Sequence, residues 1–365
     1  MTFNYRLGEL GFLAHPALAD QHGSSGNYGT LDQIAALTWV RDNIAAFGGD
    51  PERVMIFGES AGGLSVCLLR ATPLARGLFH SAIIESGGCH VATQATRYTQ
   101  GQGVAERLGC ADEPDPAACL RSRSPFELVT QIAWSAGGWI GTDPTRLWEM
   151  LHGPNIDGHV FTEDAAVTLR EGRHAKVPLV VGSNADEFQI FAPPMATCAA
   201  YYAFVAGLFG DRADDVLAKY SCFGSGTPRD AAVAVMTDLM FACEARRIAH
   251  AATAGGSPSV RRFWFTRGLS GHVLSPFEAF HTAELPFVFR TFDVLHYTPN
   301  TEDTELSQQL AGYWARFAAT GDPNGPGVPA WPAYDPATDS ALQLDIPLES
   351  IDHIRADRCD FWDAF

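Results

Sequence analysis

Residues 53–70 read RVMIFGESAGGLSVCLLR, and this stretch gives the strongest indication of the fold. It contains a short apolar run, then a G-x-S-x-G turn, then a segment of helical period, which is the arrangement of a nucleophile elbow. Such a turn holds Ser60 in a strained conformation, and Gly58 and Gly62 are small enough for strand and helix to pass closely. It also points the N–H of Ala61 at the oxygen that becomes negative when Ser60 attacks a carbonyl.

Outside this stretch, apolar runs of strand length alternate with longer segments of helical period. This alternation predicts an α/β fold with a mostly parallel central sheet and helices on both faces. No repeat or long linker divides the sequence, so we expect a single domain over residues 1–365. Helices are expected at Thr30–Ala46 and Glu305–Ala319, and strands at Val54–Phe57, Ala82–Ile84, Pro178–Val181 and Arg262–Thr266.

The composition excludes several classes of protein. The net charge is −17, from 25 Lys and Arg against 42 Asp and Glu, and such a field repels a nucleic acid backbone. No run approaches the roughly 20 apolar residues of a membrane span, and the first residues lack the pattern of a signal peptide. We therefore expect neither a nucleic acid partner nor a membrane span.

Two of the eight cysteines, Cys110 and Cys119, flank a polar segment that contains proline. This segment is typical of a loop that a disulfide can close, and two unpaired thiols in a reducing compartment are the alternative. No C-x-x-C pair occurs, so zinc-ribbon and thioredoxin-like sites have no support.

A serine nucleophile needs a histidine base and a carboxylate that orients it, and in a fold with this elbow they follow in the order serine, acid, histidine. Catalytic groups gather beyond the carboxyl ends of parallel strands. Asp186 and Glu187 both follow one strand candidate, and His272 and His281 both follow the last one. Position alone does not separate either pair.

Over its whole length, the segment FGGDPERVMIFGESAG at residues 47–62 resembles the active-site signature of the type B carboxylesterases. Other blocks similar to that family occur in the same order along essentially all 365 residues. They are NYRLG at 4–8, GNYG at 26–29 with Asp32 and Gln33, DG at 157–158, NADE at 184–187, HTAELPF at 281–287, GDPN at 321–324 and WP at 331–332.

This resemblance implies an α/β-hydrolase fold. It also implies Ser60 as nucleophile, Glu187 rather than Asp186 as the acid, and His281 rather than His272 as the base. Further roles follow from the same motifs: Ala61 in the oxyanion hole, Glu59 and Ser86 as supports of the triad, and a disulfide between Cys110 and Cys119.

The sequence departs from the family pattern in two places. Phe188 stands where the family usually has glycine after the acid, which is expected to reshape the pocket without removing the carboxylate. The family's H-G-G-type loop, which donates most oxyanion-hole N–H groups, should precede residues 4–6 by a sizeable stretch, and no H-G-G occurs here. We therefore expect that the chain lacks the N-terminal part of the family domain, keeps only Ala61 as donor, and has weak or no activity.

The sequence thus predicts a serine hydrolase that cleaves carboxylic esters through an acyl-enzyme on Ser60, with a small-molecule ester as substrate. It needs no metal or organic cofactor, since no H-E-x-x-H or Walker A motif occurs and residues 101–103 lack the third glycine of a dinucleotide loop. The alternatives are a silent homologue or truncated fragment that only binds and, among enzymes, a lipase or an amidase. The expected disulfide slightly favours an oxidising compartment.

Overall fold

The computed structural model describes residues 1–131, 153–223 and 226–365. Its centre is a six-stranded sheet of order β1-β2-β5-β6-β7-β8, in which all neighbours are parallel except the antiparallel pair β7 and β8. The strands are β1 (Met55–Glu59), β2 (Ser81–Glu85), β5 (Leu179–Asn184), β6 (Val260–Phe265), β7 (Ala341–Leu344) and β8 (Glu349–Ile351). A small second sheet pairs β3 (Ala92–Thr93) with β4 (Asn155–Ile156).

Helices account for most of the remaining described structure. The α-helices are α1 (Gly8–Phe12), α2 (Tyr28–Asn43), α3 (Ala61–Ala71), α4 (Gln94–Arg107), α5 (Pro116–Ser122), α6 (Pro125–Val129), α8 (Ala165–Arg170), α9 (Cys198–Phe209), α10 (Ala213–Lys219), α11 (Pro228–Thr237), α12 (Cys243–Ala254), α13 (Leu285–Phe289), α14 (Thr301–Thr320) and α15 (Ala356–Ala364). The short 3-10 turns are η1 (Pro16–Leu18), η2 (Ile44–Phe47), η3 (Pro73–Ala75), η5 (Glu187–Ile190), η6 (Gly210–Arg212), η8 (Ser275–Phe277) and η9 (Phe292–Leu295), and η7 (Asp238–Ala242) is a π-helix.

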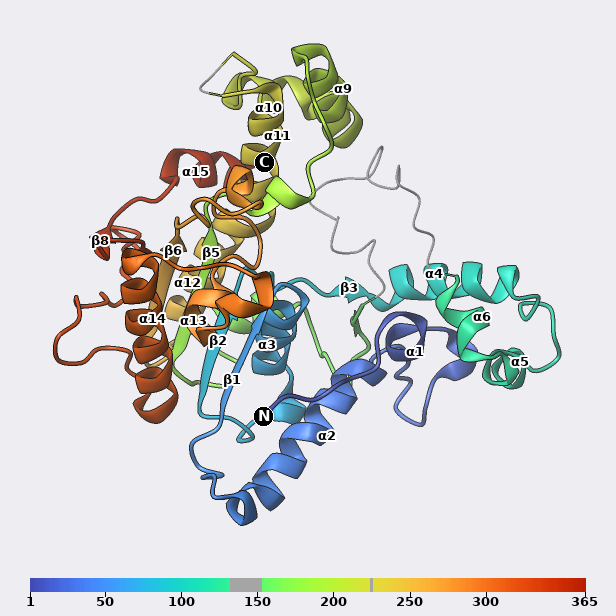
Figure 1. Ribbon diagram of the computed structural model, residues 1–365. Coiled ribbons are helices and arrows are strands. Elements are labelled where there is room, and N and C mark those ends of the chain that lie inside the picture. Colours follow the sequence, from blue (N-terminus) through green and yellow to red (C-terminus); the bar gives the residue numbers. More distant parts are fainter. Residues whose placement is uncertain (132–152, 224–225) are drawn as a thin grey trace.

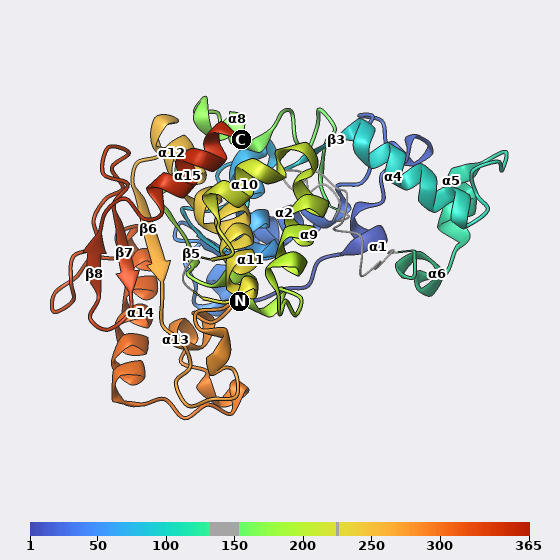
Figure 2. The ribbon, with the colours of Figure 1, turned by 90° about the horizontal axis from the view of Figure 1, so that it is seen from above.

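Both faces of the sheet are covered, as the sequence predicted. Because side chains alternate along a strand, Ala82 and Ile84 of β2 pack in one core while Ile83 packs in another. The first core includes residues of α3, α8 and α12, and the second includes residues of α13 and α14. Figure 2 shows α12 and α14 on opposite sides of the sheet. The fold is therefore a three-layer α/β arrangement.

All four predicted strands are present, and their bounds shift by one to three residues. The helix predicted at Glu305–Ala319 begins earlier, at Thr301, because Asn300 and Asp303 form a reciprocal capping box. The helix predicted at Thr30–Ala46 changes at Ile44 into the 3-10 turn η2, which ends at the left-handed Gly48.

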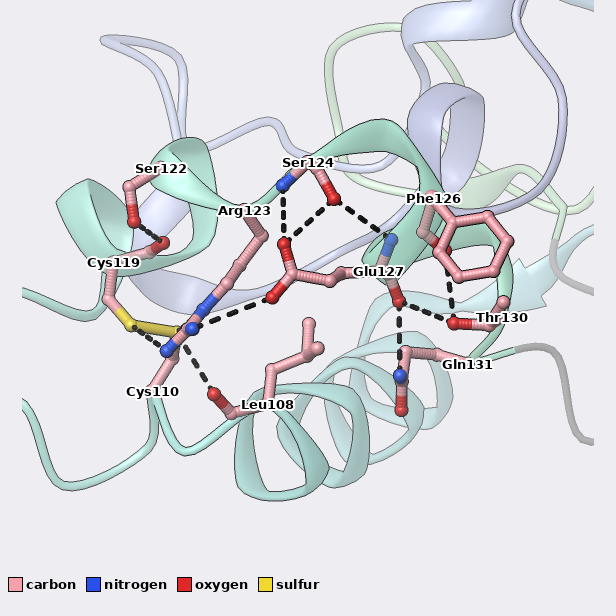
Figure 3. Close-up of polar contacts among 10 residues, drawn as sticks. All are labelled: Leu108, Cys110, Cys119, Ser122, Arg123, Ser124, Phe126, Glu127, Thr130 and Gln131. Carbon is pink, nitrogen blue, oxygen red and sulfur yellow. Dashed lines mark hydrogen bonds and ion pairs between the residues drawn. A yellow bond between two sulfur atoms is a disulfide. The ribbon is translucent and has the colours of Figure 1, made fainter.

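Helices α4, α5 and α6 extend to one side of the sheet in both views (Figures 1 and 2). The bond between Cys110 and Cys119 joins the end of α4 to α5, and Arg123 Nη2 lies 3.3 Å from the Cys119 sulfur (Figure 3). Ser124 and Glu127 then cap α6 through a second reciprocal capping box. This region has its own small core, which includes Leu13, Val104 and Leu120.

All eight cysteines are paired. Besides Cys110–Cys119, the structure contains three bonds that the sequence did not predict: Cys67–Cys89, Cys198–Cys222 and Cys243–Cys359. In the part of the chain that the structure describes, no helix combines the length and the apolar character that crossing a bilayer requires.

Candidate active site

Ser60 lies on the sharp turn between β1 and α3, with φ 57° and ψ −118°. A positive φ is unfavourable for a residue with a side chain, so the surrounding contacts must hold it in place. The N–H of Ser60 donates to the carbonyl of Glu85 on β2 at 2.9 Å, and its carbonyl accepts from Leu64 N–H at 2.9 Å. The turn leaves Ser60 partly exposed, with Ala61 at the positive end of α3.

The close approach that the sequence predicted at this turn depends on Gly58 more than on Gly62. A Cβ at Gly58 would lie 2.5 Å from the carbonyl carbon of Gly62, whereas one at Gly62 would have no described atom within 4 Å. The sequence did not single out a second close approach, between Gly63 and Gly87, where a Cβ on Gly87 would lie 2.5 Å from the Gly63 carbonyl carbon. Among the two glycines that follow Ser60, Gly63 rather than Gly62 is therefore the one that must be small.

Glu187 and His281, which lie 94 residues apart, meet beyond the carboxyl ends of β5 and β6. Nδ1 of His281 lies 2.6 Å from Glu187 Oε2. The other carboxylate oxygen, Oε1, accepts from Ser86 Oγ at 2.6 Å and from Asn184 N–H at 2.7 Å. Glu187 is fully buried and His281 nearly so. A carboxylate with these contacts fixes the tautomer and orientation of the imidazole.

Asp186 and His272, the alternative acid and base from the sequence, make other contacts. Asp186 accepts the backbone N–H of Ala279 at 3.3 Å, and burial raises its pKa. Nε2 of His272 lies 3.0 Å from the carbonyl of Leu295. The structure therefore brings together Ser86, Glu187 and His281 but places Asp186 and His272 in contacts with the backbone.

The other imidazole nitrogen, Nε2 of His281, lies 3.0 Å from Oε1 of Glu59. This is an ion-pair contact without hydrogen-bond geometry, since Glu59 Oε1 is buried and has no hydrogen-bond partner. Within the described chain, no hydrogen bond joins His281 to the hydroxyl of Ser60. Glu187 and His281 are thus in contact with each other, and Nε2, the nitrogen that would take the serine proton, faces the carboxylate of Glu59.

Two further buried carboxylates, Glu284 and Glu85, lie in the same region. Glu284 Oε2 accepts from Asn184 Nδ2 at 2.5 Å, and burial together with the charge of Glu187 raises the pKa of Glu284 to about 7. Glu85 Oε1 accepts from Trp314 Nε1 at 2.8 Å, and burial raises the pKa of Glu85 well above its ordinary value. Neither residue was predicted from the sequence to have a role in the site, although Glu284 stands three positions after His281.

These groups shift one another's proton affinities. Burial raises the pKa of Glu59 to about 8, and the carboxylates of Glu284 and Glu187 act in the same direction against the favourable charge of His281. Burial acts to lower the pKa of His281, but the hydrogen bond and charge of Glu187, together with Glu59 and Glu284, raise it to about 9. The imidazole is therefore largely protonated at neutral pH in this arrangement.

Aromatic rings enclose the imidazole. The ring centroids of Phe241 and Phe191 lie 5.0 Å and 5.4 Å from that of His281, and Phe191 is half exposed. Phe188, the departure from the family pattern, is a buried residue of η5 and packs in one core with Phe241 and with residues of α9 and α11. Phe191, directly after η5, is the second ring that lies against the histidine.

No group of three or more His, Cys, Asp or Glu side chains that could hold a metal ion occurs in residues 1–131, 153–223 and 226–365.

Comparison with known proteins shows the family of the chain. The model of the Carboxylesterase family matches residues 1–204 and 213–362. Human cocaine esterase is 34% identical over 99% of this chain and 66% of its own length. Fumonisin B1 esterase of Sphingopyxis macrogoltabida is 35% identical over 92% and 62%, and para-nitrobenzyl esterase of Bacillus subtilis (strain 168) is 33% identical over 94% and 68%. The chain thus spans about two thirds of the length of such relatives, or slightly less. It belongs to the carboxylesterase family and has the α/β-hydrolase fold.

Proposed function

We propose that this protein hydrolyses carboxylic esters of small molecules through an acyl-enzyme on Ser60. The observation that carries the proposal is the combination of a serine at positive φ on a strand–helix turn with a buried Glu187–His281 pair at 2.6 Å. Three relatives that are named as esterases support the choice of esters over other acyl compounds.

In the proposed mechanism, Ser60 Oγ attacks the ester carbonyl while Nε2 of His281 takes its proton. Glu187 stabilises the imidazolium that forms, and the N–H of Ala61 donates to the oxyanion. His281 then protonates the leaving alkoxide, and water repeats the sequence on the acyl-enzyme. Ser86 and Asn184 hold the carboxylate of Glu187, which keeps the imidazole oriented.

Glu59 has a second part in this proposal. Its carboxylate faces the nitrogen that must accept the serine proton, so it stabilises the protonated base. For Ser60 to be activated, His281 must lose that proton and turn Nε2 toward the hydroxyl. After the hydrogen bond and charge of Glu187, the charge of Glu59 is therefore a further influence that raises the pKa of His281 and the pH at which the base becomes available.

A second candidate, a binding protein without catalytic activity, is favoured by one observation: His281 contacts Glu59 and has no hydrogen bond to Ser60 in the described chain. Contacts between nucleophile and base often tighten only with substrate bound, so the geometry alone does not decide between the two. The family relation and the buried Glu187–His281 pair favour the enzyme.

The deciding experiment compares the chain with its Ser60→Ala variant on p-nitrophenyl acetate and butyrate, with a fluorophosphonate label to report the reactivity of Ser60. A matched control is Ser122→Ala, which removes a hydroxyl on α5 that donates only to the carbonyl of Cys119. We expect weak hydrolysis together with labelling of Ser60, both lost in Ser60→Ala and kept in Ser122→Ala. A folded chain that shows neither would overturn the proposal in favour of the binding protein, and p-nitroanilide substrates would identify an amidase.

A further inference from the structure

The bond between Cys67 and Cys89 joins the two segments that carry the opposite halves of the site. Cys67 lies in the second turn of α3, the helix that follows Ser60. Cys89 lies three residues after Ser86, which holds Glu187. Both cysteines are almost completely buried, with exposed fractions of 0% and 1%, so the bond lies inside the core.

These two segments already touch through their backbones. Ser60 N–H donates to the carbonyl of Glu85, and Gly63 and Gly87 approach so closely that a Cβ on Gly87 would overlap the Gly63 backbone. Glycine against glycine allows this approach but provides no side chains that interlock. The pairing of β1 with β2 fixes the strands that lead into these segments, and the disulfide adds a covalent link beyond the glycine contact, one turn farther along α3.

From Cys89, short contacts lead to the base. Ser86 Oγ donates to Glu187 at 2.6 Å, and Glu187 contacts His281 at 2.6 Å. From Cys67, the rigid helix α3 leads back to Ala61 and Ser60. We propose that the Cys67–Cys89 disulfide is a positioning element, which fixes Ser60 relative to the Glu187–His281 pair. This inference rests on the proposed function.

A second disulfide provides a matched control. Cys67–Cys89 spans 22 residues and Cys198–Cys222 spans 24, so the two restrict the unfolded chain to a similar extent. Cys198–Cys222 belongs to the core formed with α9 and α11, which reaches the site through Phe188 and Phe241 but includes no residue of the segments that follow β1 and β2. Loss of either bond is therefore expected to lower thermal stability comparably, and only one loss is expected to disturb the site.

The experiment compares Cys67→Ala/Cys89→Ala with Cys198→Ala/Cys222→Ala at temperatures well below both melting points. The readouts are kcat, KM and the second-order rate of fluorophosphonate labelling of Ser60. For the first pair we expect kcat and the labelling rate to fall by about tenfold or more with KM nearly unchanged, since small displacements of reacting groups cost rate steeply. For the second pair we expect changes below about twofold.

Equal rates in the two double variants would overturn the inference. If the alanine pair does not fold, Cys67→Val/Cys89→Ala, which restores apolar volume at one of the two sites, replaces it in the same comparison. Failure of the proposed function is distinguishable, because then the unmodified chain itself neither hydrolyses esters nor labels. An active unmodified chain whose rates do not depend on Cys67 and Cys89 would overturn the positioning role alone.

Discussion

Nε2 of His281 lies 3.0 Å from Oε1 of Glu59, the residue directly before Ser60, while Nδ1 lies 2.6 Å from Glu187. The imidazole thus sits between two carboxylates in a nearly dry environment, its exposed fraction being 4%. Negative charge on either carboxylate stabilises the imidazolium, whereas a base that accepts the proton of Ser60 must be neutral. The reactivity of Ser60 is therefore linked to the protonation states of His281 and Glu59.

Removing the charge of Glu59 is expected to move the pH dependence of Ser60 reactivity. In the unmodified chain the labelling rate should rise as His281 loses its proton, through a pKa of about 9. In Glu59→Gln this rise should occur roughly one pH unit lower, because one stabilising carboxylate is gone. The measurement is the rate of fluorophosphonate labelling between pH 6 and 10. Glu52→Gln, which removes an exposed charge, is the control. An unmoved profile in Glu59→Gln would contradict the linkage.

The same groups predict how folding stability depends on pH. Glu59 and His281 both have pKa values raised in the folded protein, to about 8 and about 9. Each therefore contributes stability that is fully present below its unfolded pKa, about 4.5 and about 6.5, and is lost as the pH rises through the folded value. We expect the unfolding free energy to fall by a few kcal/mol between pH 5 and pH 9.

Denaturant unfolding at a series of fixed pH values measures this slope of the unfolding free energy against pH. Glu59→Gln should make the slope smaller, and Glu278→Gln, which removes an exposed carboxylate, should not. A free energy that increases toward pH 9 would show that groups with lowered pKa values, rather than this cluster, dominate the slope.

The geometry of the turn around Ser60 predicts different effects of alanine at Gly58 and at Gly62. Gly58→Ala places a methyl group 2.5 Å from the Gly62 carbonyl carbon, so we expect a loss of about 1–3 kcal/mol and of most Ser60 labelling. Gly62→Ala meets no described atom within 4 Å and should keep stability within about 0.5 kcal/mol. Thermal unfolding and labelling of both variants test this. Equal losses in the two would mean that the strand–helix crossing does not have the described geometry.

Much of the fold could be predicted because it depends on local pattern. The strands β1, β2, β5 and β6 are apolar runs bounded by turns, and the elbow is defined by neighbouring residues. The short strands β7 and β8, the last two in the sheet order, were not predicted, since three or four residues give little periodicity. Three disulfides were also missed, because their partners lie 22, 24 and 116 residues apart and pairing at such distances depends on the complete fold.

The candidate site was only partly predictable for a related reason. The elbow marks Ser60 locally, but the acid and the base are brought to it by the sheet, so position along the chain left Asp186 beside Glu187 and His272 beside His281. The resemblance to a family chose between them, and in the structure Glu187 contacts His281 while Asp186 and His272 contact the backbone. The approach of Glu59 to His281 joins the last residue of β1 to the segment that follows β6, and no sequence pattern describes it.

The last prediction tests that choice of acid and base directly. Glu187→Gln should lower kcat and the labelling rate by about 10³- to 10⁴-fold, because an amide can fix the wrong imidazole tautomer and no longer stabilises the cation. His281→Ala should be at least as severe. Asp186→Asn and His272→Ala change groups that contact the backbone, and their rates should stay within about tenfold of the unmodified chain. The measurements are kcat with p-nitrophenyl butyrate and labelling of Ser60 on protein whose fold is checked by circular dichroism. If Asp186→Asn rather than Glu187→Gln removed the activity, the acid would be misassigned despite its 2.6 Å contact with His281.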